Sequence, residues 1–469
     1  MAEDFLFGVS DSGFQCEGGY NGAGEPQNNW AAWERSGRAA ATGHASDFWD
    51  RYPEHLDRAA EIGCGGYRLG VEWTRCEPQP GIIDETAVSH YAEILRACTH
   101  RGIEPVVALH HFCHPAWLGP DFWLDDDSPR QFASWVEAIV PHIAPWCSRW
   151  TTINEINAYA IGTYLIGYFP PGHRLRRRMA VRAMANMLAA HVLAYDIIHR
   201  HRPDAQVGTS TYAFWAYDVD RLLVDLLLTR EQEVSRSDLD EWIHHRRVSY
   251  HHEVTRGLPA LQRLFEVGVN NALATYLPQA SAFSAALDAV SEAMTDRSLD
   301  VVQLNYYDPR LSNYLRMPGR RTGSGRRWRP DPAHWEQRPA PEHLLCYLRA
   351  NQVPGCPIWM LENGLCNQVT GGVAQPRPDG WTRPRYLREH LRAVARAVDA
   401  GVDVRAYFHW CLFDSYQWGE YDSRFGLCEV VRENGEVKLG DTDSMGHDAA
   451  GEYQRLIEEL GPRAGLRAW

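Results

Sequence analysis

Two glutamates stand where a β-rich segment gives way to a turn, Glu155 in Thr-Ile-Asn-Glu and Glu362 in Leu-Glu-Asn-Gly. A pair of carboxyl groups can cleave a glycosidic bond, because one protonates the leaving oxygen while the other attacks the anomeric carbon. A carboxyl separation of about 5–5.5 Å gives retention of configuration, and a wider one admits water and gives inversion. A single glutamate of this kind can equally be a structural ion-pair partner. Two of them, each among Asn, Tyr, His and Trp residues, favour catalysis.

Other side chains suited to sugar chemistry also lie in or just after predicted strands. In a barrel of parallel strands, the carboxyl ends of the strands and the loops after them form the active face. We therefore expect these side chains to converge with the two glutamates at one end of the fold. They are Gln15, Glu17, Arg68, His110, His111, Asn154, Asn305, Tyr306, Tyr307, Asn363, His409 and Trp410.

The elements that must position these residues alternate between short β-rich segments and amphipathic helices, a pattern typical of a parallel α/β fold. Eight segments are predicted as strands, the number that a closed barrel needs. They are Phe5–Val9, Gly66–Trp73, Pro105–His110, Trp150–Asn154, Gln206–Thr211, Val301–Asn305, Ile358–Glu362 and Val404–Trp410.

No internal repeat or long Gly/Ser linker divides the chain, so residues 1–469 are predicted to form a single (β/α)8 TIM-barrel domain. Residues 215–299 are too many for one crossover and are expected to hold several helices. Residues 310–341 are predicted to be a long loop. The fold class is therefore α/β, with extended loops at the carboxyl face of the barrel.

Composition excludes several classes of partner. A net charge of −13 gives no electrostatic basis for binding nucleic acid or an anionic membrane. No apolar run approaches the roughly 20 residues of a membrane helix, and the first residues lack the pattern of a signal peptide. The 11 cysteines are scattered without a framework, which suits reduced thiols in the cytoplasm. We expect a cytoplasmic enzyme whose partner is a small-molecule glycoside.

Five segments in the same order resemble glycoside hydrolase family 1, the β-glucosidase family. Phe5–Gly19 is similar to the opening F-L-W-G-x-A-T-x-A-Y-Q-x-E-G, and Tyr67–Pro78 to Y-R-F-S-I-S-W-S-R-x-x-P. Thr152–Glu155 resembles the acid/base motif, and Leu361–Gly364 the nucleophile motif. Trp410–Leu427 resembles W-S-L-x-D-N-F-E-W with its R-F-G-L ending. The resemblance covers nearly the whole chain and implies a TIM barrel and a retaining β-glycosidase.

The resemblance also implies a role for each matching residue. Glu155 would act first as general acid and then as base, and Glu362 would be the nucleophile that forms a glycosyl-enzyme. Asn154 would contact the sugar 2-hydroxyl. Arg68 and Tyr307 would keep Glu362 ionised, since a cation and a hydrogen-bond donor both favour carboxylate.

The remaining roles concern support and sugar binding. Asn305 would support the carboxyl cluster. Gln15, His111 and Trp418 would bind the other sugar hydroxyls, and Trp410 would be the platform beneath the ring.

Gln417 departs from the family pattern, because the family usually has a glutamate there that binds the 4- and 6-hydroxyls of glucose. An amide keeps one acceptor but cannot accept two charge-assisted hydrogen bonds. Either the sugar is altered at the 4- or 6-position, as in a deoxy or acidic sugar, or the substitution is tolerated. Three smaller departures are Ile156, Phe112 and Cys113, in place of proline, tryptophan and aspartate.

Other signals point to simpler explanations. His110, His111, Cys113 and His114 lie close in sequence, yet neighbouring strand residues face opposite sides, so we expect no metal and no cofactor there. His244, His245, His251 and His252, with Arg246 and Arg247, are interpreted as solvated helix faces. A basic stretch is interpreted as a solvated loop that could wall the aglycone site. It holds Arg316, Arg320, Arg321, Arg326, Arg327, Arg329 and Arg338.

Two alternative functions stay open at this point. A sugar-binding pseudoenzyme would keep the barrel without turnover, although both carboxylates are present in this chain. A transglycosidase would use the same residues and pass the glycosyl group to an acceptor other than water. The sugar, the aglycone and the oligomeric state also stay open.

Overall fold

The computed structural model describes residues 5–276, 280–308, 334–433 and 435–461. Within these residues, nine parallel strands form the main sheet in the order β5-β4-β3-β2-β1-β11-β8-β7-β6. β5 pairs with β4 at one end, and β6 pairs with β7 at the other. Only Thr209 separates β5 from β6, so these two are halves of one barrel strand and close the ring.

The predicted eight-stranded parallel barrel is therefore confirmed. The strands are β1 Leu6–Ser10, β2 Gly66–Gly70, β3 Glu104–Ala108, β4 Arg149–Thr151, β5 Gln206–Gly208, β6 Ser210–Tyr212, β7 Val302–Asn305, β8 Ile358–Asn363 and β11 Val404–Trp410.

Strand ends differ from the predicted bounds where the backbone turns away. β2 ends at Gly70 rather than Trp73, because Trp73 begins the short helix α4 Trp73–Cys76. β4 ends at Thr151 rather than Asn154, and Glu155 has a left-handed backbone with φ 44°. The catalytic candidates therefore lie in the first turns after the strands.

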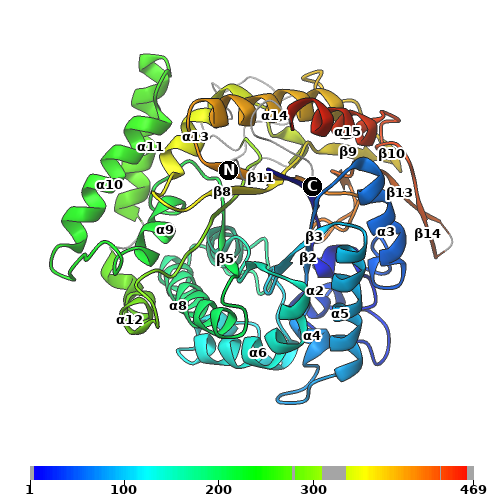
Figure 1. Cartoon of the computed structure of the whole chain (residues 1–469), viewed down its shortest axis with the longest axis horizontal. Helices are drawn as coiled ribbons and strands as arrows, with labels where there is room; N and C mark the ends of the chain where they lie inside the picture. The colour runs from blue at the N-terminus through cyan, green and yellow to red at the C-terminus, as the bar shows by residue number, and fades with distance from the viewer. Residues whose placement is uncertain (1–4, 277–279, 309–333, 434, 462–469) are drawn as a thin grey trace.

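Helices surround the strands (Figure 1). Those that follow the barrel strands include α3 Phe48–Ile62, α5 Glu85–His100, α6 Ser128–Ile143, α8 Arg177–His201, α13 Leu344–Asn351, α14 Arg383–Asp399 and α15 Ala449–Leu460. In α14, Leu387, Leu391 and Val394 are buried at intervals of three and four, which is the spacing of one helix face.

Residues 215–299 hold several helices, as predicted. These are α9 Arg221–Leu227, α10 Leu239–Val254, α11 Ala260–Tyr276 and α12 Ser284–Glu292. Of the predicted loop 310–341, residues 310–333 lie outside the described residues. The arginines of the basic stretch lie there too, except Arg338, which is described and exposed. Residues 334–341 belong to two short 3-10 turns and the segment between them.

α8 is long and apolar enough to cross a membrane by composition alone. Its apolar window is 83% buried inside the described fold, and the helix packs against α6 and α12. It therefore serves as a core helix here.

The barrel interior beneath the predicted site is filled by side chains from several strands. Phe408 of β11 lies where a Cβ on Gly8 or Gly66 would come within 2.5 and 2.7 Å of its ring. These two positions must therefore be glycine for the phenyl ring to fit. Trp359 and Leu361 of β8 belong to the same apolar cluster, which supports the strand that carries Glu362.

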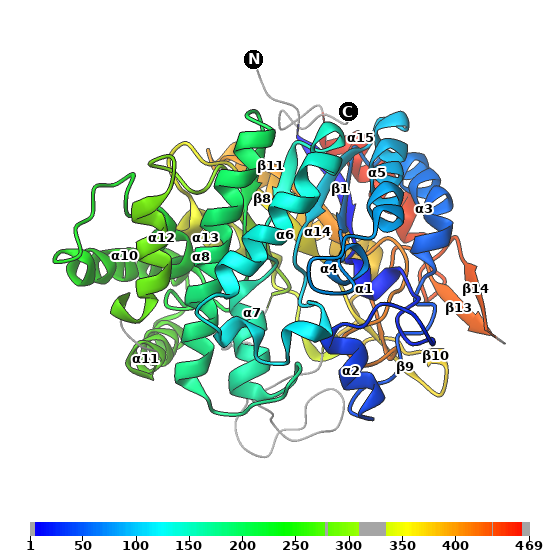
Figure 2. The same ribbon diagram turned by 90° about the horizontal axis from the view of Figure 1, so that it is seen from below.

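Segments that follow the carboxyl ends of strands gather at one end of the molecule (Figure 2). They include α1 Gly13–Cys16, α2 Asn29–Arg35, β9 Asn367–Thr370 and β10 Val373–Ala374. This agrees with the predicted long loops at the carboxyl face of the barrel.

Candidate active site

Glu362 lies near the carboxyl end of β8 and is held by two donors. The Arg68 Nη1 donates to its Oε1 at 2.5 Å, and the Tyr307 hydroxyl donates to its Oε2 at 2.8 Å. Arg68 projects from β2 and is fully buried, while the Glu362 side chain is 5% exposed. Each carboxylate oxygen thus has a donor, the arginine supplies a buried positive charge, and a hydrogen bond from Asn305 also lowers the pKa of Glu362.

Glu155 follows β4 and has a different environment. Its Oε1 accepts a hydrogen bond from Asn305 Nδ2 at 2.8 Å, and no described cation forms an ion pair with it. Its backbone N–H donates to the Ser210 hydroxyl at 3.0 Å, which holds the left-handed turn in place. Glu155 is therefore a buried carboxyl group with a neutral donor.

Asn154 links the two glutamates. Its Oδ1 accepts from Arg68 Nη2 at 2.6 Å, from the Ser210 hydroxyl at 2.7 Å and from Asn305 Nδ2 at 3.1 Å. Its Nδ2 donates to His111 Nε2 at 3.0 Å, so the neutral tautomer of His111 carries its proton on Nδ1. Burial, and then the nearby Arg68, hold the pKa of His111 well below its usual value. The imidazole is therefore neutral.

The two glutamates have raised pKa values for partly different reasons. Burial raises the pKa of Glu155 well above its usual range, and the negative charge of Glu362 raises it further. Burial also raises the pKa of Glu362, but Arg68 and the Tyr307 hydroxyl oppose this shift. Glu155 therefore retains its proton more readily, and Glu362 ionises first. Two carboxyl groups separated in this way can act as acid and nucleophile at one pH.

The residues predicted to bind sugar are close together on the same face. Gln15 Nε2 donates to the Tyr416 carbonyl at 2.6 Å and lies 3.5 Å from Gln417 Oε1. The His111 ring stacks near Trp410 and near Trp418, with ring centroids 5.8 Å apart in both pairs. His111 also joins the two tryptophans to Asn154 and so to the network around the glutamates, while Gln15 and Gln417 form a separate pair.

Sequence reasoning missed Ser210 and Ser10, which belong to this network, and Asp11, whose backbone N–H donates to the Arg68 carbonyl. Ser210 contacts both Asn154 and Glu155, and it begins β6 after the break at Thr209. Asp11 follows β1 and is buried, and burial raises its pKa to about 7 despite the hydrogen bond from Tyr67, with Glu362 adding to the rise. The only available signal was the run of polar residues directly after each strand.

The three smaller departures from the family pattern pack as apolar residues. Phe112 has a left-handed φ of 69° and its ring lies 5.0 Å from that of Trp418 and 4.9 Å from that of Phe169. Ile156 and Cys113 are buried. Phe112 therefore packs into an aromatic cluster with Trp418 and Phe169.

The neighbouring histidines do not share a ligand. His110 Nε2 accepts from Trp123 Nε1 at 3.2 Å, and His114 Nε2 lies 3.2 Å from the Gly119 carbonyl. His111 pairs with Asn154 instead. In the part of the chain that the structure describes, no three His, Cys, Asp or Glu side chains are grouped to hold a metal ion.

Comparisons with known proteins show which family and which barrel structures the chain resembles. A sequence profile for glycosyl hydrolase family 1 matches residues 1–447. A 6-phospho-beta-galactosidase of Staphylococcus aureus strain COL is 26% identical, over 93% of this chain and 95% of the relative. Among solved structures, a family 1 β-glucosidase from Thermotoga maritima is similar, with 22% identity, a TM-score of 0.69 and 98% coverage of both chains. A β-glucosidase from Exiguobacterium marinum aligns equally well, with a TM-score of 0.69.

Proposed function

The chain belongs to glycosyl hydrolase family 1, a family of retaining β-glycosidases that act on O-glycosyl bonds, and we propose that Glu362 is its nucleophile and Glu155 its acid and base. The proposal is supported chiefly by the contrast between the two carboxyl environments. Glu362 has an arginine and a tyrosine hydroxyl as donors, whereas Glu155 has only an amide. A charged nucleophile and a protonated acid are what the first step requires.

The reaction then proceeds in two steps, formation of the glycosyl-enzyme and its hydrolysis. In the first, a carboxylate oxygen of Glu362 bonds to the anomeric carbon while that carbon's bond to the leaving oxygen breaks, and Glu155 gives its proton to the leaving oxygen. In the second, Glu155 takes a proton from water, the water oxygen bonds to the anomeric carbon, and the ester to Glu362 breaks. Esterification removes a negative neighbour from Glu155, so its pKa falls and it can act as base.

The sugar that we propose is uncharged and lacks a hydroxyl at the 4- or 6-position. Gln15 and Gln417 are already engaged, because Gln15 Oε1 accepts from Ser12 and Gln417 Nε2 donates to the Ser415 hydroxyl at 3.1 Å. Gln15 and Gln417, the sugar corner of the site, therefore have few polar atoms left to bind sugar hydroxyls. Glu420, bonded through its carbonyl to the Gln417 N–H, places a carboxyl group on the same loop, which disfavours an acidic or phosphorylated sugar.

A panel of chromogenic β-glycosides tests both parts of the proposal. The panel comprises the glucoside, galactoside, fucoside, glucuronide and 6-phosphogalactoside. We expect the fucoside, a 6-deoxy sugar, to give the highest kcat/KM, and the charged glycosides the lowest. A preference for a charged glycoside would contradict the sugar proposal alone. Tight sugar binding without turnover of any member would identify a pseudoenzyme.

The nucleophile is tested separately. A 2-deoxy-2-fluoro glycoside of the preferred sugar should inactivate the enzyme and leave its glycosyl group on Glu362, as seen by peptide mass spectrometry. Labelling of another residue would overturn the assignment. Product analysis in the presence of an alcohol would show whether water or another acceptor receives the glycosyl group.

We also propose that the protein works in the cytoplasm. All of its 11 cysteines lie in the described residues and are unpaired, and ten of them are buried. Reduced thiols suit a reducing compartment. Fractionation of the source cells would test this, and activity confined to the medium would contradict it.

A further inference from the structure

Glu72 is a further departure from the family pattern. The motif Y-R-F-S-I-S-W, set beside Tyr67–Trp73, places its two serines at Gly70 and Glu72, and the opening motif places an alanine at Gly13. The three positions meet in the fold. A Cβ on Gly13 would lie 2.6 Å from Glu72 Cγ, and a Cβ on Gly70 would lie 2.7 Å from the Gly13 nitrogen. Gly13 therefore makes room for the Glu72 side chain, and Gly70 makes room for the backbone of α1.

Glu72 fastens α1, the short helix that carries Gln15. Its Oε1 accepts from the Phe14 N–H at 3.0 Å, and its own N–H donates to the Tyr91 hydroxyl of α5 at 3.1 Å. The Phe14 ring is stacked near that of Trp418, with the ring centroids 6.3 Å apart. Glu72 therefore holds the segment that carries one predicted sugar-binding residue, Gln15, and supports another, Trp418.

A second carboxyl group, that of Glu17, lies beside Glu72. A Cβ on Gly13 would lie 2.8 Å from Glu72 Oε1 and 2.9 Å from Glu17 Oε1. Glu17 has its own donors, because Arg75 Nε donates to its Oε2 at 2.7 Å and the Tyr91 hydroxyl donates to its Oε1 at 2.8 Å. No ion pair within the described residues includes Glu72. Glu72 therefore faces a negative charge whose cation is already engaged.

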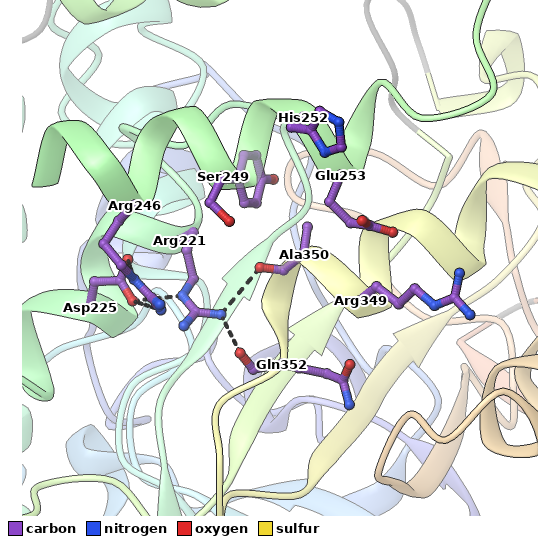
Figure 3. A pocket seen from close by; sticks show the side chains of 10 residues that line it. Arg221, Asp225, Arg246, Ser249, His252, Glu253, Arg349, Ala350 and Gln352 are labelled. Carbon is purple, nitrogen blue, oxygen red and sulfur yellow. Dashed lines mark hydrogen bonds and ion pairs between the residues drawn. The ribbon is translucent and has the colours of Figure 1, made fainter.

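Asp225 shows the opposite situation, a buried carboxylate with its own cations (Figure 3). Its Oδ1 accepts from Arg221 Nε at 2.7 Å and from Arg246 Nη2 at 2.8 Å. Burial would raise the pKa of Asp225, but these two arginines outweigh burial and lower the pKa. Asp225 is therefore ionised.

Glu72 retains its proton at neutral pH. Burial raises its pKa to about 8 and the negative charge of Glu17 contributes to the rise, although the Phe14 N–H and Arg75 oppose it. Burial also raises the pKa values of the cysteines and tyrosines around Glu72 well above their usual range, so these groups stay neutral. They are Cys16 and Tyr20 after β1, Cys76 of α4, Tyr91 of α5 and Cys113 after β3.

We propose that Glu72 is a positioning residue for sugar binding and holds α1 in place only while it carries its proton. When the proton leaves, two buried negative charges face each other beside Gly13, and they repel. α1 relieves the repulsion by moving away from β2, which displaces Gln15 and the Phe14 ring beside Trp418. Sugar binding therefore weakens at alkaline pH. This inference rests on the proposed sugar-binding roles of Gln15 and Trp418.

Infrared difference spectroscopy of the full chain tests the protonation without reference to activity. At about pH 7 the unaltered chain should show a C=O band of a protonated carboxyl group that Glu72→Gln lacks. The band should disappear as the pH rises through about 8. If Glu72 gave only a carboxylate band at neutral pH, the proposal would be overturned, whether or not the chain cleaves glycosides.

Kinetics with the preferred chromogenic β-glycoside test the positioning. The KM of the unaltered chain should rise about tenfold from about pH 7 to about pH 9, because the apparent affinity falls with the protonated fraction of Glu72. The titration of Glu72 should not appear in kcat, since saturating sugar restores the protonated state. Glu72→Gln keeps an acceptor for the Phe14 N–H and cannot ionise, so the ratio of its KM to that of the unaltered chain should fall by the same factor. That ratio cancels the titrations of Glu155 and Glu362, which both chains share.

Two further variants separate positioning from a general structural effect. Glu72→Ser, which restores the serine of the motif, should also remove the alkaline rise in KM. Glu77→Gln is the matched control and should keep the rise. Glu77 is a buried carboxyl group next to the end of α4, where it accepts from Trp73 Nε1 at 2.7 Å and from the Gly81 N–H at 2.8 Å.

An alkaline rise in KM that is equal in the unaltered chain and in Glu72→Gln would overturn the proposal. If the chain binds sugar without turnover, the dissociation constant of the free sugar, measured by calorimetry over the same pH range, replaces KM. Failure of the proposed glycosidase activity is therefore distinguishable from failure of this inference.

Discussion

Replacement of Tyr307 by phenylalanine is the most direct test of how Glu362 is kept ionised. The Tyr307 hydroxyl donates to Glu362 Oε2 at 2.8 Å, and its ring packs beside Tyr212 and Phe425. Phenylalanine keeps the ring and removes only the donor. The carboxylate loses one stabilising bond while Arg68 stays in place. The pKa of Glu362 must therefore rise.

The size of the effect follows from the type of bond. A hydrogen bond to a charged group contributes about 1.5–3 kcal/mol. One pKa unit corresponds to about 1.36 kcal/mol, so the pKa should rise by about 1–2 units. The acidic limb of the profile of kcat/KM against pH should move to higher pH by that amount. Below the limb, the variant should lose about 10–100-fold more activity than it loses on the plateau.

The assay is kcat/KM for an aryl β-glycoside measured across the pH range. Tyr195→Phe is the control, because it removes the hydroxyl that donates to Asp300 at 2.7 Å, a carboxylate outside the site network. The control can lower stability but should leave the acidic limb in place. If Tyr307→Phe changed neither the plateau of kcat/KM nor the position of its acidic limb, the Tyr307 hydroxyl would not help to keep Glu362 ionised.

Three further predictions concern the sugar corner, the acid/base and stability. Gln417→Glu should raise the kcat/KM for the aryl β-glucoside about tenfold relative to that for the β-fucoside, because the carboxylate is a charged acceptor for the 4- and 6-hydroxyls. An unchanged ratio would show that residue 417 does not bind those hydroxyls. Glu155→Ala should turn over activated aryl glycosides slowly and be rescued by azide to a β-glycosyl azide, and an α-product by mass spectrometry and NMR would contradict retention. Burial lowers the pKa of His191 to about 4, so its contribution to stability is lost as pH falls from about 6.5 toward 4. His191→Gln should therefore lower the free energy of unfolding, measured with denaturant, by about 2 kcal/mol less at pH 5 than at pH 7.5. An equal loss at both pH values would show that folding does not lower the pKa of His191.

The strands and their order were predictable because their chemistry repeats along the chain. Each predicted strand is a short apolar run followed by polar residues, and parallel strands bring those polar ends to one face. The fifth strand was the exception. The residue pattern of Gln206–Thr211 is that of one unbroken strand and gives no sign of the break at Thr209. The break separates β5, which pairs with β4, from β6, which pairs with β7, and these pairings are visible only in the folded ring. Ser210 was missed for that reason.

The difference between the two glutamates depends on contacts that a linear sequence does not display. Arg68 and Glu362 are 294 positions apart, and Asn154 accepts from Arg68 over 86 positions. Each bond exists only because β1, between β2 and the β11–β8 pair, closes that part of the ring. Both glutamates are buried, so burial alone would raise both pKa values together. What separates them is chiefly the arginine, which forms its ion pair with Glu362 and acts on Glu155 only as a more distant charge. Geometry across the barrel therefore decides which carboxyl group attacks and which one carries the proton.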